Sequence, residues 1–370
     1  MTKLVLNLSM LGPQPTGLGV YSERCAYSLA ERFQLDLIAG HGSLPDAPVC
    51  VRAPDSVAIG SGKGAAIRRQ LWMRRLRFSA DTLVYSPTHH GLPMQDGQII
   101  TVHDLICLRF PAQHRPQYLF FRFGLPRLLR KCRAVFTVSE TTRQDIAETY
   151  GFPEDRIFVV PNGVDRSLFL EQRGSAIERP YLLMVGARYP HKNIDEVLER
   201  HVHWADRYEL RITSCSGDYR MSLERKVQAL GLAGCVHFLD YVTREQLIGL
   251  YQRSAALLYP SKWEGFGIPP LEALACGVPV IASDIPVHRE VLGEAGIFVR
   301  LGDDASWGEG LAQLDKPERI LHVKEAAGHM LERWSWEHSA EALQASLLVV
   351  EPSLANRLKE HTSGAQKACA

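Results

Sequence analysis

The sequence predicts an α/β protein with two units, each a parallel sheet covered by helices. Apolar runs of strand length alternate with helical segments along the whole chain, which is typical of parallel sheets. The chain has 370 residues, which is long for one hydrophobic core and suits two domains. A turn-forming stretch near the middle divides the apolar runs into two similar sets.

Each half of the chain supplies the strands of one expected sheet. In the first half the apolar runs predict strands at 4–8, 36–39, 82–85, 99–102 and 134–138. In the second half they predict strands at 181–185, 210–214, 236–239, 255–259, 279–282 and 296–299.

The boundary between the units is expected in the stretch 158–165. A strand there runs into Pro161 and the turn pair Asn162-Gly163. We therefore assign residues 1–164 to a first domain and 165–336 to a second. Residues 337–370 form a last helix and a polar tail.

Composition points to an ordinary globular protein. The chain is 46% hydrophobic and 22% charged, with a net charge of +1. No run approaches the roughly 18 apolar residues of a membrane span, and the N-terminus lacks a signal-peptide cleavage pattern. The eight cysteines are scattered, without metal-ligand spacing. These features predict a cytoplasmic protein without a zinc site or a disulfide scaffold, and we expect no nucleic-acid partner.

Charge is unevenly distributed along the chain. Up to Val164 there are 19 Lys and Arg against 13 Asp and Glu, and the remainder has 23 against 28. Basic residues mixed with large apolar ones at 63–77 and 109–133 predict peripheral contact with the anionic cytoplasmic face of a membrane. The apolar positions form no single helical stripe, so a solvated face or a site for an anionic substrate stays an alternative.

The most informative stretch is Ser261-Lys-Trp-Glu-Gly-Phe-Gly-Ile-Pro-Pro-Leu-Glu272. Seven residues separate its carboxylates, Glu264 and Glu272, across a glycine-rich turn that opens into a helix. Glycines allow close approach of a ligand, and free N–H groups at a helix start favour a phosphate. A ligand with both hydroxyls and phosphates, such as a nucleotide sugar, fits this pattern. The alternative is a solvated helix start with a capping Glu.

This stretch closely resembles the E-x7-E motif of retaining glycosyltransferases of family 4. Those enzymes have the GT-B fold, in which two Rossmann-like α/β domains with parallel sheets face an interdomain cleft and a last helix crosses back to the first domain. The resemblance implies that Glu264 is a catalytic residue contacting the donor sugar and that Glu272 binds the ribose. It also assigns the intervening residues to donor binding: Gly265, Phe266, Gly267 and Ile268.

A second loop of the same kind is Gly186-Ala-Arg-Tyr-Pro-His-Lys-Asn193. It resembles the family's G-x-x-x-x-x-K-N loop, which implies that Arg188 and Lys192 bind the donor diphosphate. Two fixed cations suit a leaving group that gains negative charge as the glycosidic bond breaks. The alternative is an exposed basic loop, and we assign no role to the neighbouring His191.

The first glycine pair lies in Thr16-Gly-Leu-Gly-Val-Tyr21, between the first strand and a helix expected from about Ser22. It resembles the family's glycine-rich loop, which implies donor contact by Gly17 and Gly19 and acceptor contact by Tyr21. As a plain tight turn the pair would be unremarkable. Position 22 is Ser, so the third glycine of a dinucleotide fingerprint is missing, which counts against a nicotinamide enzyme.

Three histidines follow strands of the first domain, where open parallel sheets bind ligands. His103, in Thr101-Val-His-Asp-Leu105, resembles the family's H-D element, which implies a catalytic contact with the donor sugar. Its alternative is a structural histidine. Asp104 is expected to fix His103 or a nearby loop. His89 and His90 follow the strand near 84–86 and are acceptor-side candidates.

The donor's base and any metal are less clearly marked. Val242 follows a strand of the second domain where the family commonly recognises the base by backbone contacts. No Asp-x-Asp pair occurs in the sequence, so cations and a helix N-terminus must hold the diphosphate. We therefore predict a metal-independent enzyme without a cofactor.

The resemblance covers nearly the whole chain and implies a retaining hexosyltransferase. The preferred donor is GDP-mannose or a related GDP-sugar, and the acceptor is a glycan or lipid-linked saccharide in surface polysaccharide or lipopolysaccharide synthesis. UDP-glucose and dTDP-rhamnose remain open as donors. Two other classes remain alternatives: a GT-B-fold nucleotide-sugar epimerase and a non-catalytic nucleotide-sugar sensor.

Overall fold

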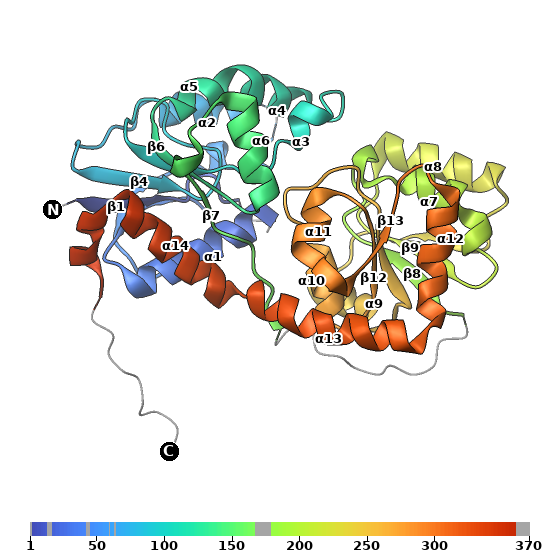
Figure 1. Ribbon diagram of the computed structural model, residues 1–370. Coiled ribbons are helices and arrows are strands. Elements are labelled where there is room, and N and C mark those ends of the chain that lie inside the picture. The colour runs from blue at the N-terminus through green and yellow to red at the C-terminus, as the bar shows by residue number, and fades with distance from the viewer. Residues whose placement is uncertain are drawn as a thin grey trace, which may run out of the picture.

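A computed structural model describes residues 2–12, 17–41, 45–58, 60–62, 64–166 and 179–359 (Figure 1). These residues form two α/β units, each with a sheet whose strands pair in parallel. The predicted fold class is therefore confirmed. The predicted division at residue 164 stays a prediction. The polar tail from residue 360 lies outside the described residues.

The first sheet has seven strands in the order β3-β2-β1-β4-β5-β6-β7. Edge strand β3 was not predicted from the sequence. Its residues are mostly exposed, so it lacks the apolar run that marked the others. The strands are β1 (Lys3–Asn7), β2 (Asp36–Ala39), β3 (Val49–Arg52), β4 (Thr82–Ser86), β5 (Gln98–Thr101), β6 (Cys132–Thr137) and β7 (Ile157–Val159).

The second sheet has six strands in the order β10-β9-β8-β11-β12-β13, and each lies where an apolar run predicted it. Strands β8, β11, β12 and β13 consist mostly of buried residues, because helices cover both faces of a parallel sheet, whereas β9 and β10 towards the edge are only partly buried. The strands are β8 (Tyr181–Met184), β9 (Glu209–Ile212), β10 (Val236–Phe238), β11 (Ala256–Tyr259), β12 (Val280–Ser283) and β13 (Gly296–Val299).

Helices lie on both faces of each sheet (Figure 1). Those of the first unit are α1 (Gly17–Arg32), α2 (Ala65–Met73), α3 (Ile106–Arg109), α4 (Arg115–Leu119), α5 (Leu125–Leu129) and α6 (Glu140–Tyr150). Those of the second unit are α7 (Ile194–Glu199), α8 (Gly217–Ala229), α9 (Arg244–Arg253), α10 (Ile268–Ala275), α11 (Pro286–Leu292), α12 (Asp304–Ala312) and α13 (Pro317–Arg333). Among the described residues, no helix combines the length and the apolar character that crossing a bilayer requires.

The last helix, α14 (Trp336–Val350), leaves α13 and returns to the first unit, where it packs against α1 (Figure 1). Ser335 caps it by accepting a hydrogen bond from the backbone N–H of His338 at 3.1 Å. Trp336 lies 6.4 Å from the Tyr21 ring, and Arg24 lies over its indole. The chain thus crosses between the units twice, which ties them together.

Strand order fixes where a ligand can bind. In the first sheet the order reverses between β1 and β4, and in the second between β8 and β11. A parallel sheet opens a crevice at the carboxyl ends of its strands beside such a reversal. Loops after these four strands carry most of the candidate residues. Helix α11 of the second unit contacts α6 of the first, so the two units face each other across this region.

Candidate active site

The centre of the site is an ion pair between Lys192 and Glu264, whose Nζ and Oε1 atoms lie 2.5 Å apart. Lys192 lies in the loop after β8, and Glu264 lies in the loop between β11 and α10. The Lys192 ammonium also donates to the Tyr259 hydroxyl at 3.2 Å, at the end of β11. The side chains are only 16% and 8% exposed, so the tertiary fold buries both predicted donor groups together.

The pair controls its own ionisation. Burial alone would raise the pKa of Glu264, but the charge and hydrogen bond of Lys192, together with smaller contributions from Ser261 and His288, hold that pKa below its usual value. Burial likewise opposes the charge of Lys192, yet the carboxylate of Glu264 raises the pKa of the amine. Both groups are therefore charged at neutral pH. When a donor binds, its diphosphate would compete with Glu264 for the Lys192 ammonium, and its sugar hydroxyls would donate to the Glu264 carboxylate.

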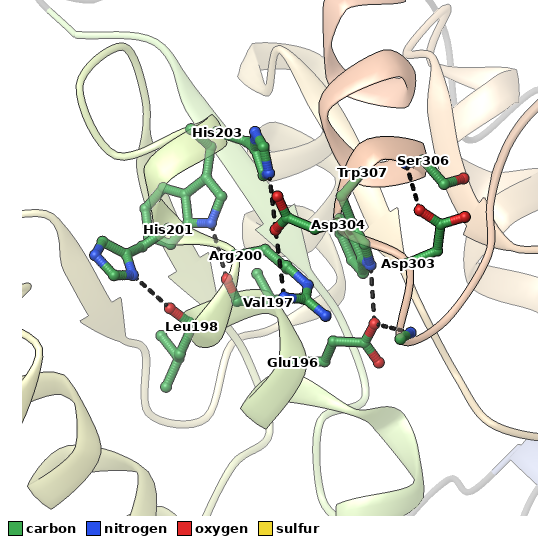
Figure 2. A network of polar contacts seen from close by, with 12 residues as sticks. Glu196, Val197, Leu198, Arg200, His201, His203, Asp303, Asp304, Ser306 and Trp307 are labelled. Carbon is green, nitrogen blue, oxygen red and sulfur yellow. Dashed lines mark hydrogen bonds and ion pairs between the residues drawn. The ribbon is translucent and has the colours of Figure 1, made fainter.

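A second buried carboxylate, Glu196, holds the Lys192 loop in place through Asn193, and Figure 2 shows its contact with Trp307. Asn193, in the left-handed region at φ 63°, donates from Nδ2 to Glu196 Oε2 at 2.7 Å. Glu196 Oε1 accepts from Trp307 Nε1 at 2.9 Å and from the Gly302 backbone N–H at 2.6 Å. Three donors satisfy this buried acid, as a buried charge requires. The network explains the Asn that follows Lys192 in the sequence.

Gly265 touches the other domain. Its carbonyl accepts from Ser139 Oγ at 2.7 Å and from Thr142 Oγ1 at 3.2 Å, both at the start of α6. A Cβ added at Gly265 would lie 2.1 Å from the His103 carbonyl oxygen. The sequence predicted that this glycine admits a ligand, and the structure shows that it admits the backbone of the first domain.

Further contacts between the domains surround Gly265. The Glu290 carboxylate accepts from the backbone N–H groups of Glu140 and Thr141, at 2.7 and 3.0 Å, so it caps α6 from the other domain. His191, for which no role was predicted, has its Nδ1 atom 3.0 Å from Gln113 Oε1. Arg109 lies 3.5 Å over the Trp263 ring. Nothing in the local sequence marks these partners, because each depends on how the domains meet.

His103 is a neutral hydrogen-bonding group. Its Nε2 lies 2.9 Å from the Pro87 carbonyl, which can only accept, so Nε2 carries the proton and Nδ1 keeps its lone pair. Burial lowers the pKa of His103 to about 4. The residue is thus suited to accept a hydrogen bond from a sugar hydroxyl. Asp104 accepts from the Ile106 N–H at 2.9 Å and holds the start of α3.

The acceptor-side candidates separate into two groups. His89 and His90 stack with ring centroids 4.2 Å apart, and His89 meets the edge of Phe121 at 4.9 Å. Tyr21 is fully buried, packs 4.6 Å from the His103 ring and donates its hydroxyl to the Val160 carbonyl at 3.2 Å. The structure therefore gives Tyr21 a packing role beside His103, and its expected acceptor contact stays a prediction.

The first glycine pair lies in a helix and not in the expected loop. Helix α1 begins at Gly17, so Gly17 and Gly19 form its first turn, five residues before the expected start at Ser22. Glycine disfavours a helix, but burial of the helix face that carries Tyr21 and Leu29 overrides this preference. Donor contact by the two glycines stays a prediction.

The start of α10 departs in part from the expectation. Gly267 precedes the helix with φ 103°, a conformation that glycine adopts readily. Pro269 and Pro270 lack N–H groups, so they remove two of the four backbone donors that a helix start normally leaves free. Phe266 is buried edge-on against Trp334 at 5.3 Å, which gives its side chain a packing role.

The remaining donor candidates lie around the same edge of the second sheet. Glu272 accepts from the Tyr251 hydroxyl at 2.9 Å, and burial raises the pKa of Glu272. The charge of Arg244, at the start of α9, partly opposes that rise, so Val242 and Glu272 belong to one neighbourhood. Arg188 is exposed, with its guanidinium 5.6 Å from the Tyr189 ring. Their individual roles stay predictions.

Within the described ranges, no group of three or more His, Cys, Asp or Glu side chains is arranged to hold a metal ion. The described residues of the site supply fixed cations, carboxylates and neutral histidines. Such a set can bind a diphosphate and orient hydroxyl groups. Independence from metal stays a prediction.

Two facing α/β domains with a buried Lys–Glu pair at their shared edge define a GT-B glycosyltransferase. Residues 15–168 match the family model described as Glycosyltransferase Family 4, and residues 165–327 match that of Glycosyl transferases group 1. The chain therefore belongs to the family 4 glycosyltransferases and is an enzyme of that class, as its sequence motifs indicated.

Two curated relatives cover most of the chain. It is 35% identical over 331 residues to the O-antigen chain mannosyltransferase RfbU of Salmonella typhimurium, which spans 86% of this chain and 92% of that one. It is 27% identical over 357 residues to the O-antigen chain mannosyltransferase B of Escherichia coli, spanning 87% and 93%.

Solved structures share the fold at low sequence identity. The sucrose-phosphate synthase from Thermosynechococcus elongatus matches with a TM-score of 0.71 at 17% identity, over 96% of this chain and 100% of that one. Anabaena Alr3699/HepE, in complex with UDP and glucose, matches at 0.68 and 15%, over 94% and 100%. WaaG, a glycosyltransferase involved in lipopolysaccharide biosynthesis, matches at 0.65 and 16%, over 94% and 99%. These likenesses confirm the GT-B fold.

Lowering the pH is expected to destabilise the protein already below pH 6.5, before most carboxylates begin to titrate. Burial lowers the pKa of His89 to about 3 and those of His103, His191 and His288 to about 4. Below pH 6.5 the unfolded chain binds protons that the folded chain excludes. The free energy of unfolding therefore has its full value above pH 6.5. It falls between pH 6.5 and about 4, by up to about 1.4 kcal/mol per pH unit for each histidine. Asp104, whose pKa burial raises to about 6, offsets part of this loss.

Urea unfolding at pH 7.5, 6.5, 5.5 and 4.5 measures this effect. We expect the free energy of unfolding to fall steeply below pH 6.5. A free energy that stays constant from pH 7.5 to 5 would contradict the neutral state of these histidines.

Proposed function

We propose that the protein transfers a hexose, with retention of the anomeric configuration, from a nucleotide sugar to a glycan or lipid-linked acceptor in O-antigen or lipopolysaccharide synthesis. Mannose from GDP-mannose is the preferred donor group, and the names of the two full-length relatives support this choice. The observation that carries the proposal is the buried Lys192–Glu264 pair, beside His103 of the opposite domain.

The mechanism follows from these groups. Lys192 and Arg188 stabilise the diphosphate as the bond from the anomeric carbon to the phosphate oxygen breaks. Glu264 and His103 Nδ1 accept hydrogen bonds from sugar hydroxyls and hold the ring. The acceptor hydroxyl attacks the anomeric carbon on the face that the phosphate leaves, and the departing phosphate oxygen takes its proton. The new glycosidic bond and the nucleoside diphosphate are the products.

A donor assay tests the proposal. The protein is incubated with GDP-mannose, UDP-glucose or dTDP-rhamnose and a lipid-linked saccharide extract, and sugar transfer is followed by mass spectrometry. We expect transfer from GDP-mannose, with unchanged rate in EDTA because no step needs a metal. Transfer from UDP-glucose or dTDP-rhamnose alone would replace the donor assignment. Loss of activity in EDTA with recovery in manganese would contradict metal independence.

The same assay separates the alternative from another class. An epimerase would convert or hydrolyse the donor in the absence of any acceptor, whereas a transferase releases nucleoside diphosphate at a rate that depends on acceptor. Acceptor-independent turnover equal to the full rate would therefore favour the epimerase.

We also propose peripheral contact with the cytoplasmic face of the membrane. Ile67 and Leu71 on α2 are exposed among basic residues, and so are Leu119 and Phe123 near α4. Figure 1 places α2, α4 and α5 together on the face of the first domain opposite α14. Lys63 of the basic stretch lies outside the described residues.

Sedimentation with phosphatidylglycerol vesicles measures this contact. We expect binding that weakens with salt and that falls at least fivefold in the Leu119→Ser/Phe123→Ser double variant, because apolar insertion and charge act together. The exposed pair Val202 and Met221, in the second domain, gives a control double variant that should bind normally. Equal binding of both double variants would contradict the assigned face.

A further inference from the structure

Arg69 is a buried cation in the first domain. It lies on α2 and is 5% exposed, unlike the exposed arginines around it. Its Nε donates to the Val57 carbonyl at 2.7 Å. Among the residues that the structure describes, no carboxylate forms an ion pair with it. Burial lowers the pKa of Arg69 to about 10, so the guanidinium is still charged at neutral pH.

Such a charge needs an explanation, because burying an unpaired cation costs free energy. The interactions of Arg69 that the structure describes use only Nε, which leaves the two Nη groups free to bind a ligand. A guanidinium presents these N–H groups as a planar fork that matches the oxygens of a phosphate. The fold thus keeps a charged fork in place for which the described part of the chain supplies no carboxylate.

The position of Arg69 in the first domain indicates which substrate carries this ligand group. Val57, its hydrogen-bond partner, follows the carboxyl end of β3, and His90 follows the carboxyl end of β4. Asn7, at the end of β1, donates from Nδ2 to the His90 carbonyl at 3.0 Å. The charge of Arg69 acts on both His89 and His90, where it adds to burial in lowering their pKa values. Met73, one turn further along α2, shares a hydrophobic cluster with Val84 of β4 and with Leu92, so α2 packs next to the segment that carries the stacked histidines. Arg69 therefore lies on the helix that flanks this ligand-binding edge of the first sheet.

The surroundings strengthen an interaction with an anion. His89 packs against Phe121, and its ring centroid lies 5.8 Å from that of Phe120. Aromatic walls exclude water and so increase the attraction between unlike charges. The two neutral imidazoles can donate one hydrogen bond each without competing with Arg69 for the negative charge.

We propose that Arg69, together with His89 and His90, forms a subsite for a phosphoryl group of the acceptor. The inference rests on the proposed function, since it assigns the acceptor to the first domain. It goes further by naming the charged group that the acceptor carries. The phosphoryl group can belong to a lipid phosphate or to a sugar phosphate, and the two sources are separable by experiment.

The test titrates the full chain with farnesyl phosphate and glucose 1-phosphate, and with farnesol and glucose as phosphate-free controls. Arg69→Gln removes the charge, Arg69→Lys keeps the charge without the fork, and Arg75→Gln is an exposed control just beyond the C-terminal end of α2. We expect Arg69→Gln to weaken phosphate-dependent binding at least tenfold, Arg69→Lys to weaken it less and Arg75→Gln to leave it unchanged. Loss for farnesyl phosphate indicates a lipid source, and loss for glucose 1-phosphate a sugar source.

Two further measurements keep the outcome clear. Thermal unfolding without phosphate should show Arg69→Gln equal to or more stable than the parent, because the variant removes an unpaired buried charge. GDP and UDP binding reports on the donor site alone, and Arg69→Gln should bind both with the affinity of the parent. An error in the donor assignment is therefore detected separately from an error in the subsite. A less stable Arg69→Gln variant that binds both phosphates with parental affinity would overturn the subsite and make Arg69 structural.

Discussion

Replacing Lys192 with alanine is expected to reduce kcat/KM by roughly 10²- to 10³-fold, because the variant removes the cation that would stabilise the leaving diphosphate. The same change leaves Glu264 buried without its partner, and we expect a loss of about 3 kcal/mol in the free energy of unfolding. Transfer kinetics and urea unfolding measure the two effects on one preparation.

A second variant separates stability from chemistry. In Lys192→Met/Glu264→Gln both charges are absent, so no unpaired charge is buried. We expect much of the lost stability to return while activity stays low. Lys262→Ala, an exposed lysine of the same region, is the control and should keep parental activity. Recovery of activity in the double variant would show that the pair serves folding alone.

Replacing Gly265 with alanine is expected to lower kcat/KM about 10²-fold while the protein stays folded. The new Cβ would lie 2.1 Å from the His103 carbonyl oxygen, a backbone atom that cannot rotate away. The domains must therefore separate at this point, which moves Glu264 away from His103 and loosens the hydrogen bonds from Ser139 and Thr142. Misplacement of reacting groups by about 1 Å is enough for such a loss.

Small-angle X-ray scattering measures the separation as an increase in the radius of gyration of the Gly265→Ala variant. Gly234→Ala is the matched control, since a Cβ at that position meets no atom within 4 Å. Parental activity in Gly265→Ala would show that the contact between Gly265 and His103 is dispensable for catalysis. An equal loss of activity in Gly234→Ala would point to a general effect of the substitution.

The contacts around Gly265 give the motif a second purpose. One carboxylate of the motif binds Lys192, and the adjacent glycine carbonyl binds the start of α6 in the opposite domain. Glu290 caps the same helix. The predicted donor contact Glu264 and the contact with α6 are thus carried by neighbouring residues, so a movement of one domain against the other would displace Glu264.

Local patterns in the sequence determined the class of fold and the main chemical groups. Alternating apolar runs predicted all but one of the strands, because burial of a strand or a helix leaves a periodic trace along the chain. Lys192, Glu264 and Glu272 could also be predicted, because each of them lies in a motif of consecutive residues. Edge strand β3 was missed because its exposed residues leave no such trace.

Tertiary structure alone decided which of these groups meet. Lys192 and Glu264 are 72 residues apart and form a pair only because β8 and β11 are neighbours in the sheet. The sequence grouped Arg69 with a solvated or membrane-facing basic stretch, and only the packing of α2 shows that this one arginine is buried. The contact of Gly265 with His103 likewise depends on how two domains close, a geometry that no run of neighbouring residues encodes.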